Sequence, residues 1–297
     1  MTRKFLLATL LALGFAVSSA GQTAAGGQEG ETRKVVVTSW TQTPMDGSRT
    51  GVTSPSIDNV RESLGYFKGG KYYAPNGRVY GRHSATARTA REIIAVQPQM
   101  ASVKKVVGYS TRVMTARPPQ SELSNWFIDN IMESVEKLSG KKVSFGVGNF
   151  GGIRCSMPEG DIILDDLMSM FPFMNQVVYL ELQGSEIRKL LEDMARGHFQ
   201  VLGGCELVVK DRKLQSALLD GKPIEDDKWY GVATISFLLD GGDRLYLRNG
   251  SRNLQIYDVD IIDIILEKVA SLTAEGKPIE YHTDNRIVIL DWEDRKR

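Results

Sequence analysis

The chain has 297 residues, of which 42% are hydrophobic and 25% are charged, and its formal net charge is +1 at neutral pH. These proportions are ordinary for a soluble globular protein, and the length allows one large domain or two modest ones with a sizeable core. The near-neutral charge, with no sustained basic run, argues against a protein that binds a nucleic-acid polymer by neutralising its phosphates.

The N-terminus has the pattern of a secretory signal peptide over residues 1–20. The positive pair Arg3-Lys4 precedes an apolar run, and small residues stand before Ala20. The run is too short for a comfortable membrane span. We therefore expect a periplasmic or secreted protein with no membrane span after cleavage. Residues 21–34 are rich in Gly, Gln, Ala, Thr and Glu, which predicts a flexible tether.

Residues 35–102 form an N-terminal segment to which the sequence assigns no fold and no chemistry. Around Gly69-Gly70 the glycines indicate turns or a hairpin. Residues 84–106 have the Ala-rich spacing of a helix, interrupted at Pro98.

The pattern becomes clearer from Ser121 onward. Apolar residues recur there at helical spacing, and Gly140 follows as a stop signal. The expected buried face of this helix consists of Leu123, Phe127, Ile131, Val135 and Leu138. Residues 143–149 then alternate between apolar and polar side chains with period two, which predicts a half-buried strand.

Helices and strands continue to the end of the chain without strict strand–helix alternation. The order is a helix near 165–171, a strand at 177–182, a helix capped by Ser185, strands at 206–210 and 213–219 with a turn at Asp220-Gly221, a strand at 229–235, a helix at 259–272 capped by Asp258, and a strand at 286–290. The expected fold class is α+β, a mixed β-sheet flanked by helices.

The two cysteines, Cys155 and Cys205, each stand just beyond a Gly-Gly pair. In an oxidising compartment they could form one disulfide. We favour the alternative of two partly buried free thiols. Two cysteines and three scattered histidines do not make a zinc site.

The most informative motif is the run from Asn149 to Arg154, NFGGIR, at the end of a predicted strand. Gly151 and Gly152 allow close approach of backbone to a ligand, and the amide and guanidinium offer hydrogen bonds to bases, ribose or anions. Taken alone, the run is equally compatible with a tight turn and a solvated arginine.

This run resembles the NGGGIR signature of the 5′-nucleotidase family, in its C-terminal substrate-binding domain. Three further motifs follow the family's order along the chain. They are R-x-x-E-S-x-L-G-N, matched by the segment from Arg117 to Asn125; L-P-F, matched by Phe171-Pro172-Phe173; and F-L-x-x-G-G-D, matched by the segment from Phe237 to Asp243. The resemblance covers roughly residues 103–290, so we expect a 5′-nucleotidase C-terminal-like domain over residues 103–297.

The resemblance implies a role for each matching residue. Phe173 and Phe237 match the aromatic pair that sandwiches the nucleobase, although core packing is the usual fate of a phenylalanine. Asp243, after Gly241 and Gly242, matches the acceptor of ribose hydroxyls, although a loop aspartate often bonds only to nearby amides.

The other matching side chains are an amide and two arginines. Asn149 matches a residue that contacts the base, and Arg117 and Arg154 match arginines of the ribose and phosphate region.

Four positions depart from the family pattern and leave the ligand preference open. Gln120 and Ser124 replace a Glu and a Gly at the helix entry, and Phe150 replaces a Gly in the loop. Arg244 replaces the usual Gly after the aspartate, where it could narrow the pocket or add a contact.

The metal-binding motifs of the family's N-terminal metallophosphatase domain, D-x-H, G-N-H-E and G-H-x-H, do not occur in this sequence. The three histidines, His83, His198 and His282, have no ligand-like neighbours. Phosphoester hydrolysis of this type uses two metal ions. We therefore expect no catalytic residues, metal ligands or cofactor in this chain, and divalent metals only in a partner.

Three functions remain open from the sequence. The favoured one is the nucleotide- or nucleoside-binding half of a 5′-nucleotidase-type phosphomonoester hydrolase. It would be inactive alone and would act in nucleotide catabolism with a separately encoded metallophosphatase chain. The alternatives are a stand-alone, non-catalytic nucleotide-binding or scavenging protein, and a complete hydrolase with an unrecognised site.

Overall fold

The structure is a computed structural model that describes residues 60–291. The predicted signal peptide and tether, residues 1–20 and 21–34, lie outside the described residues. Within residues 60–291, none of the helices combines the length and apolar character needed to cross a bilayer.

The first described elements make a small unit of their own, in a segment where the sequence indicated a hairpin and a helix but assigned no overall fold. It has a three-stranded antiparallel sheet in the order β1-β2-β3 with two helices. The hairpin expected at Gly69-Gly70 is confirmed, because both glycines have positive φ and join two antiparallel strands. The elements are α1 (Val60–Leu64), β1 (Tyr66–Lys68), β2 (Lys71–Tyr73), β3 (Val79–Gly81), α2 (Ala85–Val96) and the 3-10 turn η2 (Gln97–Met100).

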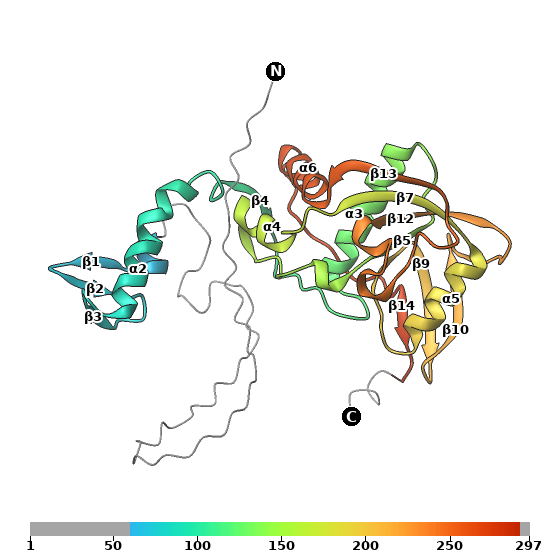
Figure 1. Ribbon diagram of the computed structural model, residues 1–297, viewed down its shortest axis with the longest axis horizontal. Helices are drawn as coiled ribbons and strands as arrows, with labels where there is room; N and C mark the ends of the chain where they lie inside the picture. Colours follow the sequence, from blue (N-terminus) through green and yellow to red (C-terminus); the bar gives the residue numbers. More distant parts are fainter. Residues whose placement is uncertain (1–59, 292–297) are drawn as a thin grey trace, which may run out of the picture. The chain divides into compact units, whose positions relative to one another are not determined.

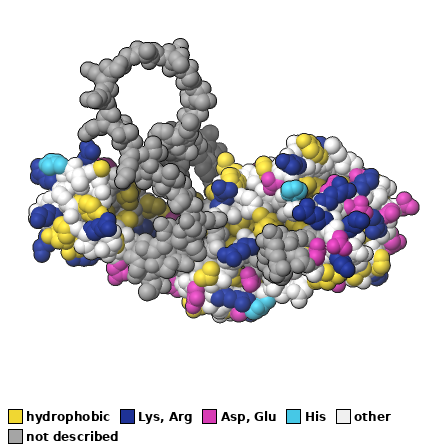
Figure 2. Space-filling model, turned by 90° about the horizontal axis from the view of Figure 1, so that it is seen from below, with side chains coloured by type: hydrophobic (Ala, Val, Ile, Leu, Met, Phe, Trp, Pro, Cys, Tyr) yellow, Lys and Arg dark blue, Asp and Glu magenta, His cyan; other side chains and the backbone are white. Residues whose placement is uncertain are grey.

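This small unit concentrates positive charge that the whole-chain total conceals. Residues 60–100 contain seven Lys and Arg residues against two Glu, and all seven cations are exposed. Figure 2 shows dark blue side chains over much of the surface of the unit. That the protein binds no nucleic-acid polymer therefore stays a prediction from the net charge.

The larger part of the described chain is built on a five-stranded mixed sheet (Figure 1). Its central pair, β12 and β5, is parallel, and the other pairs are antiparallel. In spatial order the strands are β13 (Arg252–Asp260), β7 (Gln176–Gln183), β12 (Trp229–Ile235), β5 (Phe145–Gly148) and β8 (Val201–Gly203).

Two smaller sheets complete the strands. One has four strands, in which β14 runs parallel to β9 and the other pairs are antiparallel. The other is the antiparallel pair β4 and β6. Their bounds are β11 (Lys222–Pro223), β10 (Lys213–Leu219), β9 (Cys205–Lys210), β14 (Ile287–Ile289), β4 (Val106–Ser110) and β6 (Gly160–Ile163).

The longest described helix, α3, packs across the five-stranded sheet and contacts β5, β7, β8 and β12. Two glycines of β5 make this contact close: a Cβ on Gly146 would lie 2.6 Å from Met132, and one on Gly148 would lie 2.7 Å from Phe127. The helices are α3 (Glu122–Ser139), α4 (Leu164–Met170), α5 (Gly184–Ala195) and α6 (Ile261–Ala274).

The ends of α3 are where the sequence predicts them. Ser121 precedes the helix in extended conformation, its N–H donates to the Oγ of Ser124 at 2.9 Å, and Gly140 ends the helix with φ of 64°. Four of the five residues of the expected face are buried. The prediction for Leu138 was wrong, since this side chain is 43% exposed in the last turn of the helix.

The fold class is confirmed as α+β with a mixed sheet and flanking helices. Two predicted helix caps are wrong: Gln183 precedes α5 instead of Ser185, and Asp260 precedes α6 instead of Asp258. The side chain of Asp258 instead accepts a hydrogen bond from Gln176 at 3.1 Å. Strand β13 was missed because it is an edge strand with register shifts and little burial, which removes the alternation that marks a strand.

Candidate functional site

Three of the sequence motifs leave the central sheet at the same edge. Strands β5 and β12 are parallel neighbours, so their C-terminal ends lie together. Strand β7 is antiparallel to β12, with Val177 opposite Ile235, so its N-terminal end lies at that edge too. The NFGGIR run follows β5, the FLLDGGD segment follows β12, and Phe173 precedes β7. Topology therefore brings together segments that are far apart in the sequence.

A side-chain hydrogen bond joins two of these motifs. The Nδ2 of Asn149 donates to Oδ2 of Asp243 at 2.8 Å. Asn149 is 5% exposed, and its Oδ1 is buried with no hydrogen-bond partner among the described residues. The backbone of Asp243 is left-handed, with φ of 48°, and its side chain is exposed. A fixed carboxylate with free lone pairs can accept hydrogen bonds from ligand hydroxyls.

Phe173 and Phe237 are both 45% exposed, so the core-packing alternative is wrong for both. Phe171, two residues before Phe173, behaves differently: it is 3% exposed and stacks on Phe127 at a centroid distance of 5.4 Å. The rings of Phe173 and Phe237 are not among the ring pairs in direct contact within residues 60–291. That the two rings sandwich a base stays a prediction.

Arg154 is exposed and its guanidinium lies 5.8 Å from the ring centroid of Phe173. Its Nη1 donates to the carbonyl of Gly151 at 3.1 Å, and its backbone N–H donates to the carbonyl of Met170 at 2.9 Å. Within residues 60–291 the guanidinium forms no ion pair. The side chain is therefore held near the Phe173 ring with its charge free for an anion.

Three positions in this site require glycine, because a side chain would clash there or would strain the backbone. A Cβ on Gly242 would lie 2.1 Å from the carbonyl oxygen of Phe237, and a Cβ on Gly152 would lie 2.5 Å from Oδ1 of Asn149. Gly241 has φ of 111°, which a side chain would strain. At Gly151 a Cβ would meet only an ordinary contact at 3.5 Å, so that position contributes its carbonyl and not close approach.

Within residues 60–291, no hydrogen bond or ion pair joins Arg117 to the other predicted site residues. It is exposed ahead of α3, and its backbone N–H donates to Oγ of Ser121 at 2.8 Å. Two nearby residues that differ from the family pattern have structural roles at the start of α3. Ser124 accepts the helix-capping hydrogen bond, and Gln120 accepts from the amide of Asn125 and donates to the carbonyl of Ile287.

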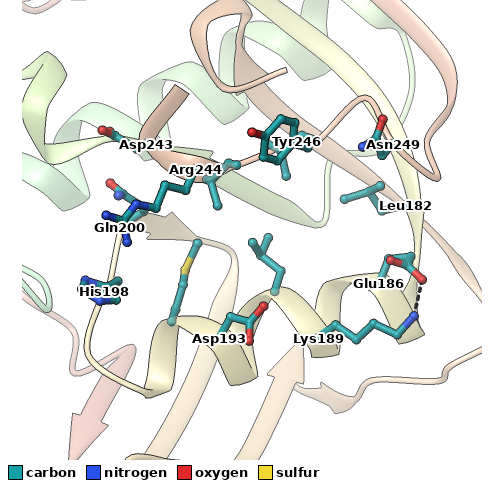
Figure 3. A pocket seen from close by; sticks show the side chains of 14 residues that line it. Leu182, Glu186, Lys189, Asp193, His198, Gln200, Asp243, Arg244, Tyr246 and Asn249 are labelled. Carbon is teal, nitrogen blue, oxygen red and sulfur yellow. Dashed lines mark hydrogen bonds and ion pairs between the residues drawn. The ribbon is translucent and has the colours of Figure 1, made fainter. Parts of the chain in front are cut away.

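A cavity of about 650 Å³ lies beside this site, between α5 and residues 243–249 (Figure 3). Of the predicted site residues only Asp243 lines it. Among the other polar residues here, the sequence marked only Arg244, as a departure from the family pattern. Tyr246 and His198 carried no signal in the sequence.

Other candidate chemistry finds no support within residues 60–291. No group of three or more His, Cys, Asp or Glu side chains is arranged there as a metal site. Both cysteines are free thiols, Cys155 partly buried and Cys205 buried. Burial raises the pKa of Cys155 to about 11 and that of Cys205 to about 12, so neither is a reactive thiolate at neutral pH.

The fold and the site define a class: an α+β domain in which polar and aromatic side chains from separate motifs lie at one edge of a mixed sheet. The sequence pattern that defines the 5′-nucleotidase C-terminal domain matches residues 100–248, and the chain belongs to that family.

Known proteins are similar to part of the chain. The chain is 32% identical to Silent protein UshA(0) of Salmonella typhimurium over 138 residues, which are 44% of this chain and 25% of the relative. It is 32% identical to Protein UshA of Escherichia coli over 136 residues, 43% of this chain and 25% of that protein. The match thus spans about a quarter of the relatives' length.

Solved structures show the same fold. A 5′-nucleotidase precursor from Thermus thermophilus superposes with a TM-score of 0.60 at 21% identity, over 69% of this chain and 43% of that one. The NAD nucleotidase of Haemophilus influenzae superposes with a TM-score of 0.53 at 15% identity, over 74% and 47%. In each case less than half of the solved structure is matched.

Proposed function

We propose that this protein is the nucleotide- or nucleoside-binding half of a 5′-nucleotidase-type phosphomonoester hydrolase, exported and active in nucleotide catabolism. A separately encoded metallophosphatase chain supplies the catalytic metals. The observation that carries the proposal is the hydrogen bond between Asn149 and Asp243, at the edge where three family motifs converge beside two half-exposed phenylalanines.

The side chains at this edge of the sheet each suit one part of a nucleotide. Phe173 and Phe237 offer aromatic faces to the base, since stacking tolerates any base. Asp243 accepts hydrogen bonds from the ribose hydroxyls, and Asn149, with one buried acceptor unpaired, gains a donor from the ligand. Arg154 has no carboxylate partner in the described part of the chain and takes the phosphate as a planar cation.

A partner is part of the proposal because this chain's residues do not fit the metals that the family implies. Hydrolysis of this kind uses two metal ions about 3.5–4 Å apart, held by histidines and carboxylates. The sequence carries none of the family's metal motifs, and the described residues hold no group of ligands. We therefore derive no hydrolytic step from this chain.

Binding is the first test. Calorimetric titration of the chain with adenosine and adenosine 5′-monophosphate (AMP) should show saturable binding of both. If neither ligand binds, the proposed function and the alternative of a stand-alone nucleotide-binding protein are both wrong.

Turnover is the second test. The chain would be mixed with a secreted metallophosphatase encoded beside it, with Mn²⁺ or Mg²⁺, and release of phosphate from AMP measured. Turnover that needs both chains supports the proposal. Binding with no gain in turnover would favour the stand-alone nucleotide-binding protein.

A further inference from the structure

The cavity beside the proposed nucleoside site has the construction of a ligand pocket. Its volume of about 650 Å³ lies in the range of small-molecule sites. Leu182, Met194 and Leu247 are buried and form an apolar floor. Polar side chains stand around it, and Figure 3 shows them projecting from α5 below and from residues 243–249 above. Apolar floor and polar walls together suit a ring that carries polar groups.

Two adjacent glycines of the proposed site each have an aromatic ring close by. A Cβ on Gly242 would lie 2.7 Å from the ring of Phe237, and a Cβ on Gly241 would lie 3.2 Å from the ring of Tyr246. Phe237 is 45% exposed, and Tyr246, which lines the cavity, is 59% exposed. An aromatic ring therefore lies against each of the two glycines.

One end of the cavity carries nitrogen donors that form no ion pair within residues 60–291. Lys189 is paired with Glu186 at 2.7 Å, and the carboxylate of Asp193 is paired with Arg196 at 3.2 Å. The side chains of Arg244 and His198, by contrast, form no ion pair within residues 60–291.

Figure 3 shows where these free groups lie. Arg244 reaches toward Gln200 and His198 at the same end of the cavity as Asp243. That end offers several hydrogen-bond donors to one anionic group.

Asp243 connects the cavity to the proposed site, because it lines the cavity and is the residue that we assign to the ribose hydroxyls. A group attached to the ribose through its 3′ oxygen therefore leaves the site next to Asp243. The 2′ hydroxyl of that ribose stays available to donate to the carboxylate, and Arg244 offsets the repulsion between the carboxylate and a phosphate at the 3′ position.

We infer that the cavity is a second nucleotide subsite. It takes the 3′-linked unit of a 5′-phosphorylated ribodinucleotide, with the linking phosphate on Arg244 and His198 and the second base on Tyr246. This inference rests on the proposed function, and it extends the ligand class from mononucleotides to short oligoribonucleotides.

The experiment titrates the full chain, by calorimetry, with AMP and with the 5′-phosphorylated diadenylate pApA. The wild type should bind pApA at least about fivefold more tightly than AMP, the gain expected from one stacked base. A third ligand, pApA with an abasic second unit, should lose most of that gain. This comparison uses only the wild-type protein, so it does not depend on the folding of a variant.

Two variants test the residues. In Tyr246→Ala and in Arg244→Asn the ratio of pApA affinity to AMP affinity should fall toward one. Asparagine tolerates the left-handed backbone at position 244, where φ is 65°. The matched controls are Tyr109→Ala, an exposed tyrosine of β4, and Arg212→Asn, an exposed arginine that also has a left-handed backbone, with φ of 57°, and does not line the cavity. Both controls should keep the wild-type ratio.

The outcomes separate the two proposals. Equal affinity of the wild type for AMP and pApA would overturn the second subsite and leave the proposed function standing. A preference for pApA that survives both cavity variants would also overturn it. Failure of AMP to bind would remove the proposed function, and the inference with it.

Discussion

The amide of Asn149 and the carboxylate of Asp243, 94 residues apart in the sequence, are joined by a hydrogen bond of 2.8 Å. This bond fixes the carboxylate on a loop whose backbone is left-handed at Asp243 and Arg244. It is possible because β5 and β12 run parallel, so that the loops that follow them meet at one edge.

Asp243→Asn should weaken binding of adenosine by about 1–2 kcal/mol, because one of two carboxylate acceptors becomes a donor amide. Asparagine accepts the left-handed backbone, so the loop should keep its shape. Binding of 2′,3′-dideoxyadenosine, which has no ribose hydroxyl donors, should hardly change. Calorimetry with both ligands checks this, and an equal loss for both would show that Asp243 does not contact the ribose.

Phe237→Ala should weaken nucleoside binding by about 1–3 kcal/mol through the loss of stacking. Because the ring is 45% exposed, the melting temperature should change little. The matched variant is Phe171→Ala, whose ring is 3% exposed and stacked on Phe127. That change should cost about 3–5 kcal/mol of folding free energy. Unfolding of the Phe237 variant would mean that its ring is structural.

Arg154→Ala should weaken binding of AMP more than binding of adenosine, since the guanidinium is assigned to the phosphate. The control is Arg188→Ala, which removes a partly exposed arginine that is already paired with Asp226. Equal losses for nucleotide and nucleoside would place Arg154 at the ribose or give it a structural role. If neither affinity moves, the role implied by the NFGGIR resemblance is wrong.

The purified chain should release no phosphate from AMP when divalent metal is added, because binding energy accelerates hydrolysis only where a reactive centre can use it. With the cognate metallophosphatase chain present, turnover should appear and Phe237→Ala should reduce it. Metal-dependent turnover by the isolated chain, abolished by a substitution within it, would reveal a catalytic site that the sequence analysis missed.

Stability should fall in acid through a network at Arg286. This arginine is 6% exposed and its guanidinium contacts Asp129 and Asp284 at 2.7 Å each. Partial burial would raise the pKa of Asp284, but the hydrogen bonds from Arg286 outweigh burial and hold the pKa below its usual value.

A lowered folded-state pKa fixes the sign of the pH dependence. The stabilisation from Asp284 is complete above the ordinary aspartate pKa of about 3.9 and is lost as the pH falls through the folded-state pKa. Asp284→Asn should therefore lower the melting temperature at pH 7, and the difference from wild type should shrink below about pH 4. Asp193→Asn, in an exposed ion pair, should have little effect at either pH. A difference that persists unchanged in acid would contradict this account.

Local sequence signals were sufficient for much of the fold. The helix from Ser121 to Gly140 was predictable because its caps and its apolar period are both local, and strand β12 was found with its bounds. The same reasoning failed for Leu138, since the reach of the sheet along α3 depends on strands that are distant in the sequence. It failed for β13 because an exposed edge strand has only weak alternation.

The sequence by itself determined the fold class, the family resemblance and the residue types available for a ligand, because capping, periodicity and motif spacing are properties of neighbouring residues. It left open whether Phe173 and Phe237 were core or surface, and it carried no sign of the cavity at Tyr246. Only the tertiary structure decided these points. Exposure and cavities arise where separate segments meet, and here the strand order β7-β12-β5 and the packing of α5 bring those segments together.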